Sequence, residues 1–208
     1  MPLPSRPTPE VINSHLQTWE RLENYRLQEQ SLALLFHKLC PQNSILEHVL
    51  LKVTALNQFY STNIFDTYSV AKHIVHLAID GRLSNKDLTL VNELAKVTIR
   101  NKPKNFYSFA SKYCNHHLPD AYPIYDSFVE KMLLHYQKVD KFEVFKKADL
   151  KNYSRFVGII TSFQKHYTLE QFSLRQLDVF LWLAGKYCFP KNYSKKKSDV
   201  IPPAISVA

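Results

Sequence analysis

The chain has 208 residues, enough to bury a sizeable core in one domain or in two small lobes. It contains only 3 glycines, and long stretches lack both proline and glycine, which favours an all-α fold over a β-rich or Rossmann chain. No glycine-rich phosphate loop is present. Lys and Arg outnumber Asp and Glu by 27 to 18, a formal charge of +9, so we expect a polyanionic partner such as nucleic acid.

Membrane association, export and metal binding are not expected. No long uncharged apolar run occurs, and no basic segment followed by an apolar one stands at the N-terminus. Cys40, Cys114 and Cys188 form an odd, scattered set typical of reduced thiols in a cytoplasm. His116 and His117 follow Cys114, but a second pair at ligand spacing is missing, so we predict no metal and no cofactor.

Taken in chain order, the sequence predicts a proline-rich arm over residues 1–9, one helical domain over 10–189 and a basic, mobile tail over 190–208. A basic, hairpin-like connection is expected over residues 100–105. Helix-start signals and apolar spacing predict helices over the following ranges: 10–39, 44–59 with a capping box at Ser44–Glu47, 66 to a turn at 80–81, 84–99, 106–116, one from Asp126, and a last one from Ser173 with Gln176 as its capping partner.

Asp126 lies in a turn that contains Pro123 and leads into a helix. At a helix N-terminus a carboxylate accepts backbone N–H bonds and faces the positive end of the helix dipole, which keeps it ionised. Such a carboxylate could stabilise a cationic sugar as a base departs and orient the attacking water. Asp is also a common helix cap, so a purely structural role stays open for this residue.

Three stretches in this order resemble the helix–hairpin–helix DNA glycosylases, and more narrowly small proteins with the 8-oxoguanine DNA glycosylase fold. The stretches are Leu50–Gln58 with Thr62 and the Val70-Ala71 helix, Ser108–Lys112 through Pro123–Ser127, and Leu177–Trp182. The resemblance implies a two-lobed helical fold with a cleft between the lobes. It also implies that Asp126 is the catalytic carboxylate.

Three departures from the family pattern bear on mechanism. The family's glycine-containing hairpin is replaced by Lys102-Pro103-Lys104-Asn105-Phe106, so lysine side chains would have to contact the DNA phosphate. Tyr125 is an extra residue before Asp126. The register of the family's lysine nucleophile falls near residues 107–108, whereas Lys112 lies about one turn further along the same side of its helix. Lys112 is therefore either a Schiff-base nucleophile or a side chain whose head meets water or phosphate, and the register favours the second.

A flipped base needs a pocket that stacks on it and reads its edge. Asp178 and Trp182 are four residues apart on one helix, so they point the same way, and the alternative is a core Trp beside a solvent-facing Asp. Further base-binding candidates are Asn57, Gln58 and Tyr125, with Tyr60 as another pocket residue. The predicted backbone contacts are Arg100, Lys102, Lys104 and Asn105, whereas the basic residues 146–155 are expected to form a solvated helix face.

The sequence thus predicts a monomeric, cytoplasmic DNA glycosylase that acts on double-stranded DNA without a cofactor and leaves an abasic site. The substrate would be an oxidised guanine or another, bulkier modified base, such as a hypermodified phage cytosine met in antiphage defence. Two alternatives remain open: a non-catalytic DNA-binding protein that retains the glycosylase fold, and a helical protein-interaction domain whose charge serves solubility alone.

Overall fold

A computed structural model describes residues 2–190 of the chain, and the predicted tail lies almost wholly outside them. The described residues are mostly helical, as the composition predicts, with one small antiparallel sheet. The elements are α1 (Pro9–Arg21), α2 (Glu23–Leu34), the π-helical turn η1 (Leu35–Leu39), α3 (Leu46–Tyr60), α4 (Thr67–His76), α5 (Asp80–Ser84), α6 (Thr89–Leu94), β1 (Lys96–Ile99), β2 (Lys102–Asn105), α7 (Tyr107–His117), α8 (Ser127–Asp140), the 3-10 helix η2 (Lys147–Lys151), α9 (Tyr153–His166) and α10 (Leu174–Cys188).

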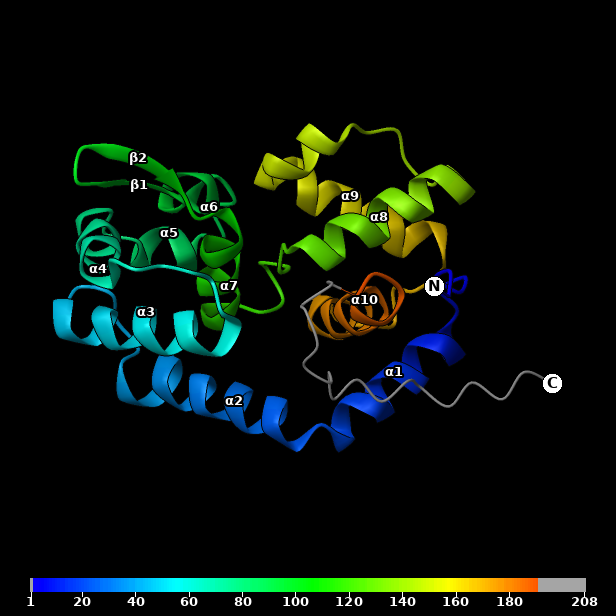
Figure 1. Ribbon diagram of the computed structural model, residues 1–208, viewed down its shortest axis with the longest axis horizontal. Coiled ribbons are helices and arrows are strands. Elements are labelled where there is room, and N and C mark those ends of the chain that lie inside the picture. The colour runs from blue at the N-terminus through cyan, green and yellow to red at the C-terminus, as the bar shows by residue number, and fades with distance from the viewer. Residues whose placement is uncertain (1, 191–208) are drawn as a thin grey trace.

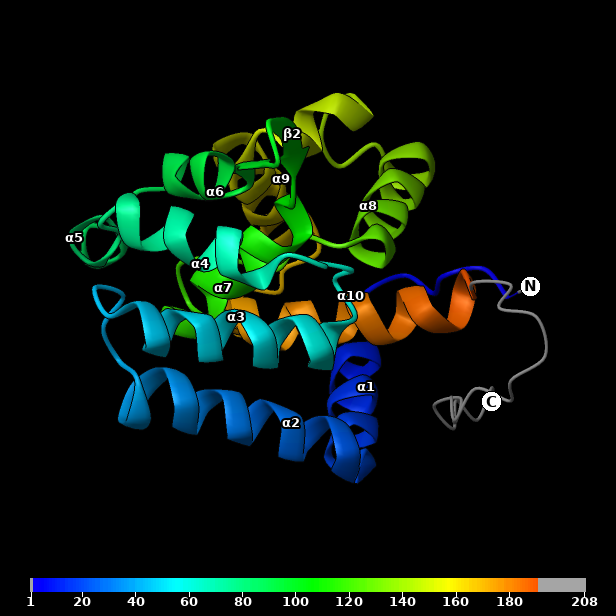
Figure 2. The same ribbon diagram turned by 60° about the vertical axis from the view of Figure 1, so that its left-hand side comes forward.

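The elements form two groups that face each other (Figure 1). In the first group α3 packs against α4 and α7, α6 packs against α7, and the β1–β2 hairpin lies against α4 and α6. In the second group α10 packs against both α1 and α8. Helix α2 runs below the first group and joins it to α1, as the turned view shows (Figure 2). Both groups contribute side chains to one continuous hydrophobic core.

The predicted long helix over residues 10–39 is interrupted at Leu22, where φ is −88° and ψ is 71°. The break has a packing reason: α1 buries Ile12 and His15 and contacts α10, whereas α2 contacts α3 and, with η1, buries Leu32 and Phe36. One straight helix could not contact elements that lie in different groups. Apolar periodicity alone does not reveal such a break.

The segment before α7 is a β-hairpin, which confirms the hairpin-like connection and corrects the helix predicted through residue 99. Helix α6 ends at Leu94, and the next residues pair in the register Lys96 with Asn105 and Ile99 with Lys102. Arg100 and Asn101 form the two-residue turn with positive φ values of 48° and 60°, as hairpin turns of this length favour. The β-branched residues at 97–99 suit a strand.

Several predicted helix starts are correct, but those at Ser44 and Ser84 are not. Helix α5 begins at Asp80, where a turn was expected, and ends at Ser84, and α6 begins only at Thr89. Asp66 caps α4 through Ser69 N, and Ser173 and Gln176 form the reciprocal capping box of α10. Helix α3, by contrast, begins after Ile45 with no side-chain cap, so the predicted box at Ser44 does not form. The prolines at positions 2, 4 and 7 lie within the extended N-terminal segment, and Pro9 itself opens α1.

The extended N-terminal segment packs on the second group of helices. The Tyr136 hydroxyl donates to the Ser5 carbonyl at 2.7 Å, and the Arg6 guanidinium lies 5.7 Å from the centre of the Tyr167 ring. Within residues 2–190, no helix combines the length and apolarity that a bilayer crossing requires.

Candidate functional site

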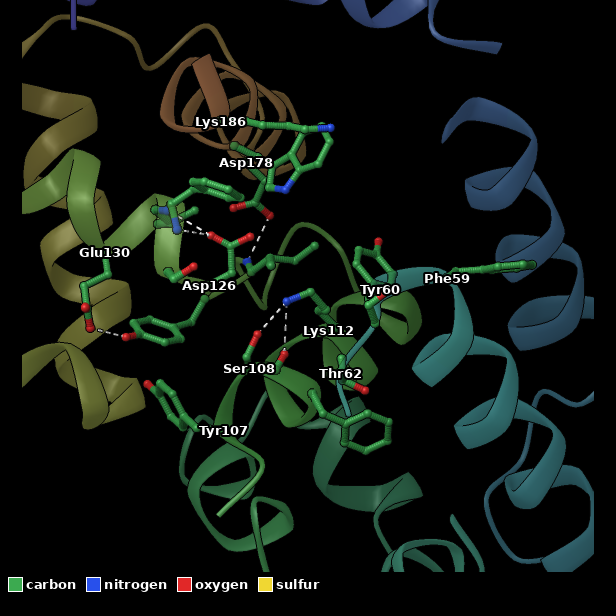
Figure 3. A pocket seen from close by; sticks show the side chains of 18 of the residues that line it. Phe59, Tyr60, Thr62, Tyr107, Ser108, Lys112, Asp126, Glu130, Asp178 and Lys186 are labelled. Atoms are coloured by element: carbon green, nitrogen blue, oxygen red, sulfur yellow. Dashed lines mark hydrogen bonds between the residues drawn. The ribbon is translucent and has the colours of Figure 1, made fainter. Parts of the chain in front are cut away.

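A cavity of about 680 Å³ lies where the two groups of helices meet (Figure 3). Its walls come from both groups: from α1 and α2, the end of α3, α7, the turn before α8, η2 and α10. Its volume falls within the range of about 300–1,000 Å³ that is typical of small-ligand sites. Seven residues predicted for the site line it: Tyr60, Asn105, Lys112, Tyr125, Asp126, Asp178 and Trp182.

Asp126 is the N-cap of α8, and its carboxylate enters the cavity (Figure 3). Its Oδ1 atom accepts hydrogen bonds from the Phe128 and Val129 backbone N–H groups at 2.8 and 2.9 Å. Both bonds use the same oxygen, so capping the helix does not by itself occupy Oδ2. The positive end of the α8 dipole also favours negative charge at this position. The capping role and a chemical role are therefore compatible.

The turn that carries Asp126 is fixed by buried side chains from three helices. A side chain bonds the backbone of each of four successive residues, 122–125. Two side chains donate to carbonyls: Asn115 to that of Tyr122 (2.8 Å) and the Tyr153 hydroxyl to that of Pro123 (2.7 Å). Two side chains accept from backbone N–H groups: Asp178 from Ile124 (3.0 Å) and Ser111 Oγ from Tyr125 (3.0 Å). Such a shell holds a reactive group in one geometry before a ligand arrives. The position of Asp126 is preorganised.

Lys112 lies inside the cavity with only 4% of its surface exposed. Its ammonium donates to Ser108 Oγ at 2.6 Å, one helical turn earlier on α7, and lies 5.3 Å from the centre of the Tyr60 ring (Figure 3). The Lys112 side chain is buried, so any water or phosphate that its head meets would lie inside the cavity. The head lies among cavity groups, on the same side of α7 as the register position at Ser108.

Tyr60 is oriented by a buried histidine. Its hydroxyl lies 3.0 Å from His116 Nε2. Burial raises the pKa of Tyr60 to about 12, and burial, with the nearby cations Arg175, His37 and Lys112, lowers the pKa of His116 to about 3. Both groups are therefore neutral near pH 7, so the hydroxyl can donate to the unprotonated ring nitrogen. Nowhere in residues 2–190 are three His, Cys, Asp or Glu side chains grouped so as to hold a metal ion.

Asp178 is buried, which corrects the alternative of a solvent-facing Asp beside a core Trp. Its Oδ2 atom accepts the Ile124 N–H, so it supports the turn that carries Asp126. Burial raises the pKa of Asp178 to about 8; Asp126 adds to the rise, while the Ile124 bond, Arg175 and Lys112 oppose it. Near pH 7 this carboxyl therefore holds a proton in most molecules, and a protonated carboxyl can donate a hydrogen bond as well as accept one.

Trp182 belongs to an aromatic cluster at one end of the cavity, which we call the aromatic end: Trp19, Tyr25 and Trp182. Trp182 meets Tyr25 and Trp19 edge to face, with ring centres 5.1 and 6.1 Å apart. The Lys186 ammonium lies 4.9 Å from the centres of both Tyr25 and Trp182. The sequence did not predict Tyr25 or Lys186, because α1 and α2 lie at the other end of the chain from α10.

Tyr125 connects the cavity to a second charged cluster. Its hydroxyl donates to the Glu130 carboxylate and accepts from the Lys151 ammonium. Glu130 also pairs with Lys147 at 2.9 Å. Burial and the Glu130 bond raise the pKa of Tyr125 far above its ordinary value. Lys151 is exposed, as expected of a solvated face, and it also lines the cavity. Glu130, four residues after Asp126, could have been suspected from that spacing.

The structure does not bring Asn57 and Gln58 into the cavity, which corrects their expected role as base readers. The Asn57 side chain accepts from Thr62 Oγ1 (2.7 Å) and from Ile64 N–H (3.0 Å), and donates to the Ile64 carbonyl (2.9 Å). These bonds fix the loop that follows α3. Gln58 is exposed. The next two residues, Phe59 and Tyr60, line the cavity instead.

The four residues expected to contact a DNA backbone all lie on the β1–β2 hairpin. Arg100 occupies its turn, Lys102 and Lys104 are exposed on β2, and Asn105 ends β2 at the rim of the cavity. Only Asn105 lines the cavity itself. The hairpin therefore presents its positive charge outside the cavity, next to the entrance that Asn105 reaches.

Fold and site together define a helical protein with a preorganised, carboxylate-containing cavity. Residues 11–121, more than half of the chain, match the family HI_0787_N, described as an N-terminal domain. A Haemophilus influenzae protein that carries the name "Uncharacterized protein" is 50% identical over 151 residues, which is 72% of each chain. The chain belongs to this family. No solved structure matches it.

The family match covers one side of the cavity. Tyr60, Ser108 and Lys112 lie within the matched residues, whereas Asp126 and Asp178 follow them. The cavity is therefore completed by the part of the chain beyond this domain.

Proposed function

We propose that the protein is a DNA glycosylase with a two-lobed fold of the helix–hairpin–helix glycosylase type. The observation that carries the proposal is Asp126: a helix-capping carboxylate in a turn fixed by four hydrogen bonds, opening into a cavity of about 680 Å³ beside a buried lysine. The two facing groups of helices would be the lobes. A modified base would leave the DNA stack and enter the cavity between them.

The reaction is hydrolysis of the N-glycosidic bond. The base leaves with the electron pair of its bond to C1′, and positive charge develops on the sugar. Asp126 stabilises that charge and orients a water molecule whose oxygen bonds to C1′. The proton lost by the water passes to the carboxylate or to solvent, and the departing base takes up a proton. The products are the free base and an abasic site in an intact strand.

Lys112 decides between two classes of glycosylase. An unprotonated amine could attack C1′ as the base leaves with the electron pair of its bond. Loss of the amine proton and opening of the sugar ring at C1′–O4′ would then give a Schiff base, which leads to strand cleavage. In the proposed water route, the ammonium that is bonded to Ser108 instead contributes positive charge inside the cavity. The register difference between Lys112 and the family's nucleophile supports the water route. Borohydride trapping, which captures only a Schiff base, distinguishes the two.

Double-stranded DNA is the proposed partner of a monomeric, cytoplasmic enzyme. The formal charge of +9 and the exposed lysines of the hairpin support binding to the phosphate backbone. Because Lys102 and Lys104 are exposed and outside the cavity, they can contact phosphates without occupying the base site. Substitution of both by Ser should weaken binding to any duplex sequence and lower the salt dependence by about two units of slope.

The test is base release from a panel of duplexes of one sequence that carry 8-oxoguanine, uracil, alkylated bases or modified cytosines. Hot alkali reveals abasic sites, and a parallel sample without alkali reveals strand cleavage by the protein. The proposal predicts release of at least one base, cleavage only after alkali and no borohydride-trapped complex. Salt-dependent DNA binding without release from any duplex would contradict it and favour a non-catalytic DNA-binding protein.

A further inference from the structure

The cavity continues well beyond the reacting groups, along one side of α10. Asp178, Trp182 and Lys186 are spaced by four residues each, and all three line it. Eight residues of α-helix span about 12 Å. Asp178 stands next to the Asp126 turn, so along α10 Trp182 lies about one helical turn and Lys186 about two turns further from the reaction centre. A base bound beside Asp178 would leave the region around Trp19, Tyr25 and Lys186 open to another part of the ligand.

The aromatic end combines ring faces with polar groups of both kinds. Lys186 donates to the Tyr25 hydroxyl at 2.7 Å, and the Arg175 guanidinium lies over Trp19, 5.3 Å from the ring centre. Arg175 donates to the Glu29 carboxylate at 2.6 Å. These side chains are all partly exposed, and Gln28 beside them also lines the cavity. Cationic donors, a carboxylate and an amide thus surround three aromatic rings.

This composition suits a hydroxyl-rich ring better than a plain nucleobase. A hydroxyl group both donates and accepts, and here Lys186 and Arg175 offer donors while Glu29 and Gln28 offer acceptors. The apolar C–H face of a saturated ring can pack on an aromatic ring. Lys186 stands two helical turns from Asp178 along α10, so a substituent on the base is better suited to reach it than the flat base itself.

We propose that the aromatic end is a subsite for a sugar-like substituent carried by the excised base, so that the substrate is a glycosylated base. This inference rests on the proposed glycosylase function and names its substrate class. The base itself binds beside Asp178, and the substituent extends along α10 between Trp19, Tyr25 and Lys186.

The experiment compares single-turnover release from three duplexes of one sequence, which carry glucosylated 5-hydroxymethylcytosine, 5-hydroxymethylcytosine or 8-oxoguanine. The wild type is compared with Lys186→Met and Tyr25→Ala. Matched controls come from lysine–aromatic pairs that do not line the cavity: Lys131→Met, whose ammonium lies 5.8 Å from the Phe189 ring, and Tyr68→Ala, which pairs with Lys72 at 5.5 Å.

The glucosylated base should be released at least tenfold faster than 5-hydroxymethylcytosine. Loss of a charged hydrogen bond in Lys186→Met should slow its release about 10- to 100-fold. The factor by which this variant slows base release should be at least tenfold smaller for the other two duplexes. Both control variants should release all three bases as fast as the wild type. Equal release of the first two bases by the wild type, or equal slowing of all three by Lys186→Met, would overturn the subsite.

Failure of the proposed chemistry gives a different result, namely no release from any duplex. The affinity of the wild type and Lys186→Met for the glucosylated and unglucosylated duplexes is then compared. Selective weakening of the glucosylated complex would support the subsite in a protein without glycosylase activity. Equal affinities for both duplexes would refute the subsite as well.

Discussion

Asp178→Asn should remove a pH dependence of stability that the wild type shows between about pH 4 and pH 8. Burial raises the pKa of Asp178 to about 8, against an ordinary value of about 3.9. Between these values the folded chain holds a proton that the unfolded chain has lost. The free energy of unfolding therefore falls as pH rises, by up to about 1.4 kcal/mol per pH unit from this group, and levels off above pH 8.

Asparagine is a suited substitution because its side-chain oxygen can still accept the Ile124 N–H, bonded at 3.0 Å in the wild type. Urea unfolding of both proteins at pH 5, 6, 7 and 8 provides the assay. The stability of the wild type relative to the variant should decrease steadily over this range. Carboxyls with lowered pKa values, such as Asp66 and Asp87, are present in both proteins and cancel in the difference. A difference that stays constant from pH 5 to pH 8 would show that Asp178 is ionised throughout, and would refute the reasoning.

Four further substitutions test buried contacts of the fold through thermal or urea unfolding. Gly185→Ala places a Cβ 2.8 Å from Phe128 Cβ, so it should lower the free energy of unfolding by about 1–3 kcal/mol. The Cβ of Gly158→Ala meets nothing within 4 Å, so that variant should gain about 0.5–1 kcal/mol of stability. Effects of the same sign in both variants would contradict this. Asn57→Ala breaks three hydrogen bonds of the loop after α3 and should cost about 1–3 kcal/mol, so an unchanged midpoint would count against that role. Burial lowers the pKa of Lys52 to about 8. Between about pH 8 and pH 10 the unfolded chain therefore holds a proton on this residue that the folded chain has lost. The free energy of unfolding of the wild type rises with pH over that range because of this group. Lys52→Met should lack this gain, and an identical rise in both proteins would refute it.

The sequence predicted those features that depend on local chemistry. Asp126 and Ser173 cap their helices because their side chains reach N–H groups two or three residues away, and such spacing is visible in the sequence. The hairpin connection was recognised, but the strand before it was not, because residues 96–99 also continue a helical pattern. Arg100 and Asn101 show that the turn uses positive φ without glycine.

The features that the sequence did not predict depend on contacts between distant elements. The break at Leu22 is explained only by the different neighbours of α1 and α2. Tyr25 reaches Trp182 and Lys186 from a helix at the other end of the chain. Asn57 had the residue type of a base reader, yet its amide is bonded to the adjacent loop. Residue type alone does not distinguish these roles.

The central claim is tested most directly by the rate of base release from the best-released duplex of the panel, measured under single-turnover conditions for the wild type and Asp126→Asn. Asn caps helices about as well as Asp, so the variant should fold with a melting temperature within a few degrees of the wild type. Loss of the preorganised charge should slow release at least about 100-fold. Release by Asp126→Asn within tenfold of the wild type would contradict the account.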